Sequence, residues 1–486
     1  MGRRLRAGWG IAVLAAVAAC GTGEGPAASL VIENVTLIDG TDGGARPGMT
    51  VAVSGDRIVA VGPTGSTPLG EVASRIDGNG LYLIPGLWDS HAHLFGYQER
   101  ALPLFLANGV TTIRDVGGVL DRVGYLRQET RFNRLLGPTI LMAGPVLDAP
   151  LVTRQVGSGR ISVPTPAEAG QAVDTLAKAG VDFIKVHSLT PRAAYFEILR
   201  AARSRGLPVV GHVPDSVSAA EAIDSGQRTI EHDFGIALAN SSRGPELVAW
   251  LEAASARYVA RAGDRARIGP LFDLRLAARD SALASYDSAT AAGFAARAAA
   301  KDVWFTPTLT VLMSMARRNE RAVREPPELR FAPKEVLEYD EGLPPSANPT
   351  AAEIAAGRAA WEQTKAEYRE LVRAKARFLA GTDTPVVPLV PGFSLHWELE
   401  LLVEIGLTPL EAIQAATRNP AQAMGREHEG TIAVGNVADL VLLAGDPLAD
   451  IANVRKVISV VTRGRILERT TLDRFLQDAE TFAKQR

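Results

Sequence analysis

Near both ends of the chain, hydrophobic and polar residues alternate in short runs separated by turn signals such as Asp39-Gly40 and Gly55-Asp56. These runs lie at 30–38, 49–53, 58–61, 435–443, 457–461 and 464–467. Alternation over a few residues predicts half-buried β-strands. Because neither end has enough strands for a stable domain alone, we predict that segments 30–80 and 430–470 combine into one composite β-sandwich.

The central part of the chain alternates strand-like apolar runs with helical patterns. Helical patterns lie, for example, at 166–179, 191–204 and 216–225. Eight apolar runs have the length of buried strands: 83–90, 110–116, 139–143, 181–186, 208–211, 229–231, 303–306 and 378–381. Eight successive β-then-α units predict an α/β fold, a (β/α)8 TIM barrel spanning residues 81–429.

Segments 237–301 and 313–375 are too long for ordinary crossovers, and both are rich in Ala, Arg and Glu. We predict that they are helical insertions. They follow the sixth and seventh strands, so we expect them over the C-terminal face of the barrel, where active sites form. They would act there as lid and specificity elements, or alternatively only pad the rim. A further helix is predicted at 471–486.

The N-terminal segment 1–20 has the layout of a secretory signal, with a basic start followed by a short Ala/Val/Leu stretch. It ends in Val17-Ala18-Ala19-Cys20, which resembles a bacterial lipobox. We therefore expect lipidation of Cys20, a flexible tether at 21–29, and a protein anchored to a membrane of the bacterial cell envelope, facing the periplasm. The alternative is a plain signal peptide, with a periplasmic or secreted product.

Composition narrows the class of protein. The chain has 486 residues, 47% hydrophobic and 22% charged, which is ordinary for a globular protein with a large core. The net charge of −2 gives no support to nucleic-acid binding. Cys20 is the only cysteine, which excludes disulfides within the chain and thiolate metal ligands.

Metal-binding and acid/base residues follow several of the predicted strands. His91 and His93 are spaced i, i+2, so in a strand both point to one face and can hold a divalent metal. For an isolated pair, surface or core histidines without a metal would be the more common explanation. Four further strands end in such residues: Lys185, His212, His232 and Asp383. Because parallel strands of a barrel end at the same face, we expect all six side chains to converge.

These motifs resemble the amidohydrolase superfamily of metal-dependent hydrolases, and more narrowly its imidazolonepropionase-like and prolidase-like subgroup. The resemblance covers roughly residues 30–470. It rests on the following motifs: His91-Ala92-His93, Gly109-Val110-Thr111-Thr112-Ile113-Arg114-Asp115, Ile184-Lys185-Val186, Gly211-His212, Glu231-His232, Gly381-Thr382-Asp383-Thr384, Ala415-Ala416-Thr417-Arg418-Asn419-Pro420-Ala421 and Gly435-Asn436-Val437-Ala438-Asp439-Leu440.

The resemblance implies a binuclear site with two divalent ions, of which zinc is the expected metal. His91, His93 and Asp383 would bind one ion, and His212 and His232 the other. Lys185 would bridge them as an N-carboxylated lysine. Lysine in water is protonated, with a pKa near ~10.4, but burial beside two cations disfavours the ammonium form and favours the anionic carbamate.

Hydrolysis of an amide is the expected reaction. Two metals can share a hydroxide and lower its pKa toward ~7, and Asp383 is suited to relay the proton from the hydroxide to the leaving amine. The resemblance favours a small dipeptide or N-acyl amino acid as substrate.

Alternative functions remain open at the level of sequence. Deaminase relatives typically use one metal and a glutamate shortly after the strand-five histidine, whereas here His212 is followed by Val213-Pro214-Asp215 and the nearest glutamate is Glu221. A cyclic-amide hydrolase of the imidazolonepropionase type is a second alternative. The non-enzyme alternative is a lipoprotein that uses the barrel as a binding module.

Three further residues are candidates for substrate binding. His187 shares a strand face with Lys185, and a packing role is an equal explanation. His396 follows the eighth strand, where it could instead cap a helix. Arg114 ends the second strand and could alternatively pair with Asp115 or a neighbouring carboxylate.

Overall fold

The computed structural model describes residues 25–485, apart from 157–158, 234, 338–345 and 347. Cys20, the predicted signal segment and the first part of the predicted tether lie outside the described residues. Within the described part of the chain, no helix has the length and apolar character needed to cross a membrane.

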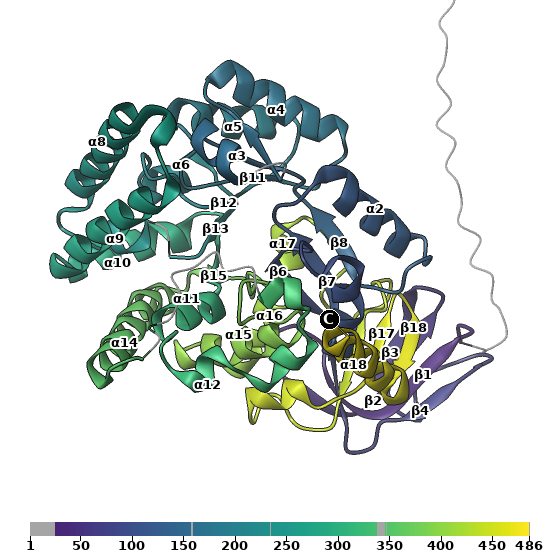
Figure 1. The fold of residues 1–486 in the computed structure, drawn as a ribbon. Helices are drawn as coiled ribbons and strands as arrows, with labels where there is room; N and C mark the ends of the chain where they lie inside the picture. Colours follow the sequence, from purple (N-terminus) through teal and green to yellow (C-terminus); the bar gives the residue numbers. More distant parts are fainter. Residues whose placement is uncertain (1–24, 157–158, 234, 338–345, 347, 486) are drawn as a thin grey trace, which may run out of the picture.

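Strands from both ends of the chain form a single eight-stranded sheet, seen as adjacent purple and yellow arrows in Figure 1. The N-terminal members are β1 (Leu30–Ile38), β2 (Ala45–Ser54), β3 (Arg57–Pro63), β4 (Arg75–Asp77) and β5 (Tyr82–Pro85). The C-terminal members are β16 (Leu440–Leu443), β17 (Val457–Thr462) and β18 (Arg465–Glu468). The sheet order is β18-β17-β16-β5-β1-β2-β3, with β4 beside β1. The predicted union of the two ends is therefore present, and its arrangement as a sandwich stays a prediction.

The contact between the two ends is made by β5 and β16, which pair antiparallel with Leu440 opposite Pro85. Buried side chains from both ends, including Ile32, Leu83 and Val461, share one hydrophobic cluster. The alternating pattern read from the sequence thus places one face of each strand in a common core.

Eight parallel strands form the central barrel. They are β6 (Leu87–Ala92), β7 (Val110–Asp115), β8 (Thr139–Met142), β11 (Ile184–Val186), β12 (Val209–Gly211), β13 (Thr229–Glu231), β14 (Trp304–Thr306) and β15 (Arg377–Phe378). The segment after β15 closes the ring on β6, because the Ser90 amide donates to the Ala380 carbonyl and Ala92 bridges Thr384 in parallel. An α/β barrel is thus the central architecture.

Two details of the strands differ from the sequence prediction. The predicted strand 83–90 is two strands, β5 and β6, which part at Gly86 and enter different sheets. A Cβ on Gly86 would lie 2.1 Å from Thr111 Oγ1, so only glycine permits this close passage. In addition, β9 (Val146–Asp148) and β10 (Arg160–Ser162) form an unpredicted pair beside β11, with α3 (Pro150–Val156) between them.

Helices surround the barrel strands. They are α1 (Ala101–Ala107), α2 (Leu120–Arg131), α4 (Pro166–Lys178), α5 (Arg192–Ser204), α6 (Ala219–Ser225), α15 (Phe393–Glu404), α16 (Pro409–Ala415) and α17 (Arg418–Ala423). Their starts follow local capping chemistry: the side chains of Thr165 and Ser218 each accept from a backbone amide three residues later. The C-terminal helix α18 (Arg469–Lys484) packs against α1.

The two long segments after β13 and β14 are helical. The first holds α7 (Ile236–Ala239), α8 (Gly244–Ala262), α9 (Ile268–Ala284) and α10 (Ser288–Ala300). The second holds α11 (Leu309–Ala316), α12 (Arg321–Arg324), α13 (Lys334–Leu337) and α14 (Ala351–Arg373). Contacts between α10 and α14 join the two insertions, and Figure 1 shows both on the same side of the molecule.

Candidate active site

The six predicted ligand residues line one cavity of about 380 Å³ at the C-terminal ends of the barrel strands. His91 lies at the end of β6, and His93 follows it. Lys185 lies on β11, His212 and His232 directly follow β12 and β13, and Asp383 lies beyond β15. The structure therefore brings together residues that are separated by almost 300 positions in the sequence, as the barrel prediction requires.

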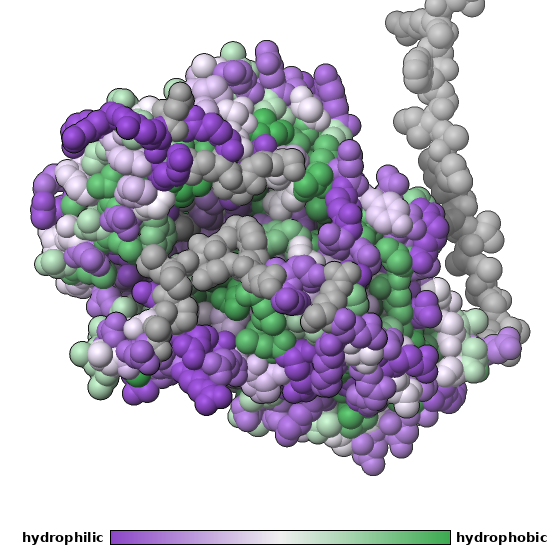
Figure 2. Space-filling model, in the orientation of Figure 1, coloured by the Kyte–Doolittle hydropathy of each residue, from purple (hydrophilic) through white to green (hydrophobic). Residues whose placement is uncertain are grey.

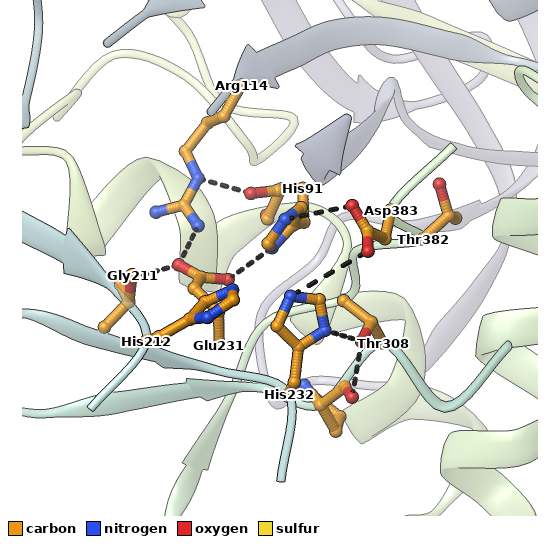
Figure 3. A network of polar contacts seen from close by, with 12 residues as sticks. His91, Arg114, Gly211, His212, Glu231, His232, Thr308, Thr382 and Asp383 are labelled. Atoms are coloured by element: carbon orange, nitrogen blue, oxygen red, sulfur yellow. Dashed lines mark hydrogen bonds and ion pairs between the residues drawn. The ribbon is translucent and has the colours of Figure 1, made fainter. Parts of the chain in front are cut away.

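Asp383 contacts several of the histidines, and Figure 3 shows its carboxylate joined to His91 and His232. Its Oδ1 lies 3.3 Å from Nε2 of His91 and 3.3 Å from Nε2 of His93. Its Oδ2 lies 3.8 Å from Nε2 of His232. One ligand atom from each of His91, His93 and Asp383 lies within 4.8 Å of the others, which is close enough to hold one metal ion.

His212 and Lys185 extend the cluster beyond this first group. The ring centre of His232 lies 4.7 Å from that of His91 and 4.8 Å from that of His212. Lys185 is 2% exposed, and its Nζ has no hydrogen-bond partner among the described residues. Lys185, His212 and His232 thus lie in the same cavity, beside the first group.

The other ring nitrogen of three histidines is held by a hydrogen-bond acceptor. Nδ1 of His91 lies 2.8 Å from Glu231 Oε2, and Nδ1 of His93 lies 2.9 Å from the Gly117 carbonyl oxygen. Nδ1 of His232 lies 2.7 Å from Thr308 Oγ1, whose own hydroxyl donates to the Pro307 carbonyl. Because these partners accept, the network assigns the proton to Nδ1 and leaves the Nε2 lone pair for a metal.

Ser188 has the corresponding place beside His212. Its Oγ lies 2.6 Å from His212 Nδ1 and can accept the same kind of bond. All four histidines therefore have a hydrogen-bond partner at Nδ1, which is usual for histidines that bind metal through Nε2.

Arg114 does not line the cavity, so its predicted contact with substrate is wrong. It is fully buried, with Nη2 3.0 Å from Glu231 Oε1 and Nε donating to the Ser90 carbonyl. Burial opposes ionisation of Glu231, but Arg114 and His91 hold the pKa of this carboxyl well below its usual range. Arg114 thus keeps charged the carboxylate that orients His91, and the alternative of pairing with a neighbouring carboxylate is correct.

The other two substrate-binding candidates differ from each other. His187 does line the cavity; its Nδ1 lies 2.9 Å from Asp148 Oδ2, and burial lowers its pKa to about 4, so the ring is neutral at pH 7. His396 does not line the cavity, and its Nε2 donates to the Asn108 carbonyl at 2.9 Å inside the core. Both interpretations of His396, substrate contact and helix capping, are wrong because packing of α15 against the end of α1 buries the ring.

Three residues of the site have a left-handed backbone, which is unusual for residues other than glycine. The φ angles are 59° at His232, 48° at Thr308 and 62° at Asp383. Each such conformation costs on the order of 1–3 kcal/mol and persists only where the surrounding contacts fix it. Here the strained turns direct two ligands and the hydroxyl that orients one of them into the cavity.

Glycines allow the strands that carry the ligands to approach closely. A Cβ on Gly211, before His212, would lie 2.1 Å from the Val186 carbonyl oxygen. A Cβ on Gly381 would lie 2.7 Å from the His91 amide nitrogen. Any side chain at either position would push the ligand-bearing strands apart.

The charges of Lys185 and Asp383 fit a metal site. Burial lowers the pKa of Lys185 to about 8, so its neutral amine is accessible near neutral pH. Burial opposes ionisation of Asp383, but His91 and His93 hold its pKa well below the usual range. Four imidazoles and one carboxylate, beside a lysine amine without a hydrogen-bond partner among the described residues, are donors that can hold a divalent metal ion.

The helical insertions form most of the cavity wall. Hydrophobic side chains from α7, α8, α9 and α11 line it: Leu238, Val248, Leu251, Phe272, Leu276, Val311, Leu312 and Met315. Figure 2 shows a hollow in this face of the molecule, with hydrophobic residues beside it. The insertions therefore shape the space above the ligands and do more than pad the rim.

Replacing Thr308 with valine tests the orienting network. Valine keeps the shape and the β-branching at this strained position but removes the acceptor for His232 Nδ1. We expect metal affinity to fall by about 10–100-fold, measured by competition with a chromophoric chelator. The matched control is Thr306→Val, because the buried Thr306 hydroxyl has no hydrogen-bond partner among the described residues. Equal metal affinity in both variants would contradict this role of Thr308.

Sequence reasoning missed the partners that support the ligands. Glu231 belongs to one of the sequence motifs, but the motif alone does not predict that it supports a histidine. The sequence also does not predict supporting roles for Ser188, Thr308 and Asp89. Burial raises the pKa of Asp89 to about 7, and Asp89 accepts from the Thr382 hydroxyl at 2.7 Å. The available signal was the presence of Asp89 and Glu231 inside apolar strand runs, since a buried carboxyl requires partners.

Comparison with curated proteins gives local matches. A segment of 115 residues is 36% identical to the adenine deaminase of Rubrobacter xylanophilus, covering 22% of this chain and 19% of that protein. A segment of 89 residues is 44% identical to the N-acyl-D-aspartate deacylase of Alcaligenes xylosoxydans xylosoxydans, covering 18% and 17%. The chain thus matches about a fifth or less of the length of these relatives.

Solved structures match over nearly the whole chain. The bottromycin amidohydrolase has a TM-score of 0.71 and 25% identity, with 93% of this chain and 90% of that chain covered. A protein described as a prolidase from Bifidobacterium longum has a TM-score of 0.62 and 25% identity, covering 93% and 98%.

The model of the family described as "Amidohydrolase family" matches residues 82–467. This range holds the whole barrel, both insertions and all six predicted ligands. The chain therefore belongs to the amidohydrolase family.

Proposed function

We propose that the protein is a binuclear metal-dependent hydrolase that cleaves an amide or peptide bond in a small substrate, a dipeptide or an N-acyl amino acid. The observation that carries the proposal is the convergence of four oriented imidazoles, Asp383 and the buried amine of Lys185 in one cavity. His91, His93 and Asp383 would hold one divalent ion, and His212 and His232 a second, with zinc as the expected metal.

Lys185 is proposed to bridge the two ions after carboxylation. Its neutral amine would add CO₂ to form an N–C bond, with the N–H proton released to solvent, which gives an anionic carbamate. The lowered pKa of about 8 makes the neutral amine available. The absence of a hydrogen-bond partner for Nζ among the described residues is consistent with room for this added group.

Asp383 is proposed to move the proton. Bound divalent ions supply Lewis acidity, which acidifies water and polarises a carbonyl group. The Asp383 carboxylate would accept the proton of the attacking water and then donate it to the nitrogen of the leaving amine. Its 16% exposure, within the cavity lining, lets it reach both groups.

Deamination is the second candidate, and the local matches to adenine deaminases favour it. The position of Glu221 argues against deamination. Glu221 closes the capping box of α6 with Ser218 and pairs with Arg192, and it does not line the cavity. The nearest glutamate after His212 is thus engaged elsewhere and is not placed to protonate a ring nitrogen.

Metal analysis combined with a substrate screen tests the proposed function. We expect about two zinc ions per chain, loss of activity on chelation, recovery with zinc, and release of amine from dipeptides or N-acyl amino acids. One metal per chain with ammonia released from adenine would establish the deaminase instead. A protein with neither metal nor turnover would indicate the binding-module alternative.

Lipid anchoring through Cys20 is also proposed. Mass analysis of the mature N-terminus tests it.

A further inference from the structure

Four arginines line the active-site cavity, and three of them have a carboxylate partner. Arg160 lies 2.8 Å from Asp148, and Arg279 lies 3.2 Å from Asp233. Arg275 forms a two-pronged pair with Asp215, both bonds at 2.9 Å. The charges of these three side chains are thus matched within the protein.

Arg318 is the exception. It follows α11 and is half-buried, and its Nη1 donates to the carbonyl of Met315 at 3.1 Å. Its Nε is buried with no hydrogen-bond partner, and no ion pair joins Arg318 to any carboxylate of the residues that the structure describes. A guanidinium keeps its charge at any physiological pH, so partial burial without a counter-ion is unfavourable unless a ligand supplies one.

The surroundings strengthen the interaction that Arg318 offers. The cavity wall includes apolar residues from the two helices of the same insertion: Leu312, Met315 and Ala316 from α11 and Ala360 from α14. Apolar walls lower the local dielectric and so strengthen the attraction between the guanidinium and an anion. A planar guanidinium with donors left over is suited to bind a carboxylate through two parallel bonds.

Arg318 shares one cavity with the metal-ligand cluster. A cavity of about 380 Å³ is in the range that encloses a single small molecule. An anionic group at Arg318 and the bond cleaved beside Asp383 would therefore belong to the same substrate, with an apolar portion against the helices between them.

We propose that Arg318 determines substrate specificity by binding the free carboxylate of an N-acylated amino acid, or of the C-terminal residue of a dipeptide, whose side chain is apolar. The proposal deepens the proposed amide hydrolysis and rests on it. Neutral amides of the same shape would leave the guanidinium without a counter-ion and would be poor substrates.

Matched acids and carboxamides test the proposal. The probes are the N-acetyl derivatives of leucine, methionine, phenylalanine and proline, each as the free acid and as the primary carboxamide, with acetate release as the readout. The wild type is expected to prefer the acid in kcat/KM by about 10–100-fold, the usual contribution of a hydrogen bond to a charged group. In Arg318→Met the ratio of acid to carboxamide should fall to about one, mainly through KM, whereas Arg318→Lys should restore part of it.

The control is Arg321→Met, on the exposed surface of α12 outside the cavity lining, which should keep the wild-type preference. A wild type that does not discriminate, or an Arg318→Met variant with an unchanged ratio, would overturn the role of Arg318. If no probe is hydrolysed, the proposed function fails for this class. Calorimetric binding of N-acetyl-leucine to the wild type but not to Arg318→Met would then still support Arg318, and equal binding to both would overturn it.

Discussion

Replacing Asp383 with asparagine is expected to lower kcat by about 10³-fold, while metal remains bound in large part. Asparagine keeps an oxygen at the place where Asp383 Oδ1 lies 3.3 Å from two imidazole Nε2 atoms. An asparagine amide cannot accept and return a proton. The transfer of a proton from water to the leaving amine would therefore lose the group that acts first as base and then as acid. The measurement is steady-state turnover together with metal content on the same preparation.

The control for this variant is Asp121→Asn, since Asp121 lies exposed on α2, outside the cavity lining. It should leave both turnover and metal content as in the wild type. Near-normal kcat in Asp383→Asn would contradict the role of Asp383 in proton transfer. Complete loss of metal would instead show that Asp383 acts chiefly as a ligand.

Replacing Lys185 with alanine should reduce the metal content from about two ions to about one per chain and lower kcat by roughly 10²–10³-fold. Alanine removes the bridging group but leaves the histidines and their Nδ1 partners in place. Since the proposed bridge is a carboxylate, added acetate or propionate should restore part of the activity. Metal analysis and turnover with and without the added acid give the result.

A direct measurement accompanies this prediction. ¹³C nuclear magnetic resonance of wild-type protein supplied with ¹³C-bicarbonate should show a carbamate resonance that Lys185→Ala lacks. Lys301→Ala, an exposed lysine at the end of α10, is the control and should behave as the wild type. Two metals and near-normal turnover in Lys185→Ala would show that the lysine does not bridge the ions.

The convergence of the candidate ligands in one cavity could be predicted from where they lie along the chain. His91, Lys185, His212 and His232 each stand on or directly after a short apolar run. In a barrel, the ends of all parallel strands meet at one face, so the pattern along the chain determines that these side chains meet. Their convergence could therefore be predicted without knowing how the loops pack against one another.

The supporting residues could not be predicted in the same way. Arg114 supports His91 only because Glu231, from a strand four positions further along the barrel, reaches across to both side chains. Thr308 becomes a partner of His232 only through the left-handed turn after β14. A carboxyl inside an apolar strand run indicates that a partner exists, but which residue is the partner depends on side-chain directions inside the ring.

The residues of the insertions that face the cavity could not be predicted from the sequence either. Helix α9 has hydrophobic residues distributed around much of its surface, so its pattern does not single out Phe272 and Leu276 as the cavity wall. Arg318, which has no carboxylate partner among the described residues, is likewise one of many arginines in an Arg-rich segment. Only the three-dimensional positions of the carboxylates distinguish Arg318 from the arginines that form ion pairs.

The pairing of β5 with β16 has a consequence for how the protein is made. During synthesis, one edge of β5 stays without its partner until residues 440–443 have left the ribosome, because β16 lies after the barrel. Pairing of segments so distant in sequence is slow and leaves strand edges exposed to other chains in the meantime. Since β5 leads directly into β6, which carries His91, we expect the candidate metal site to reach its final geometry only after β16 has paired.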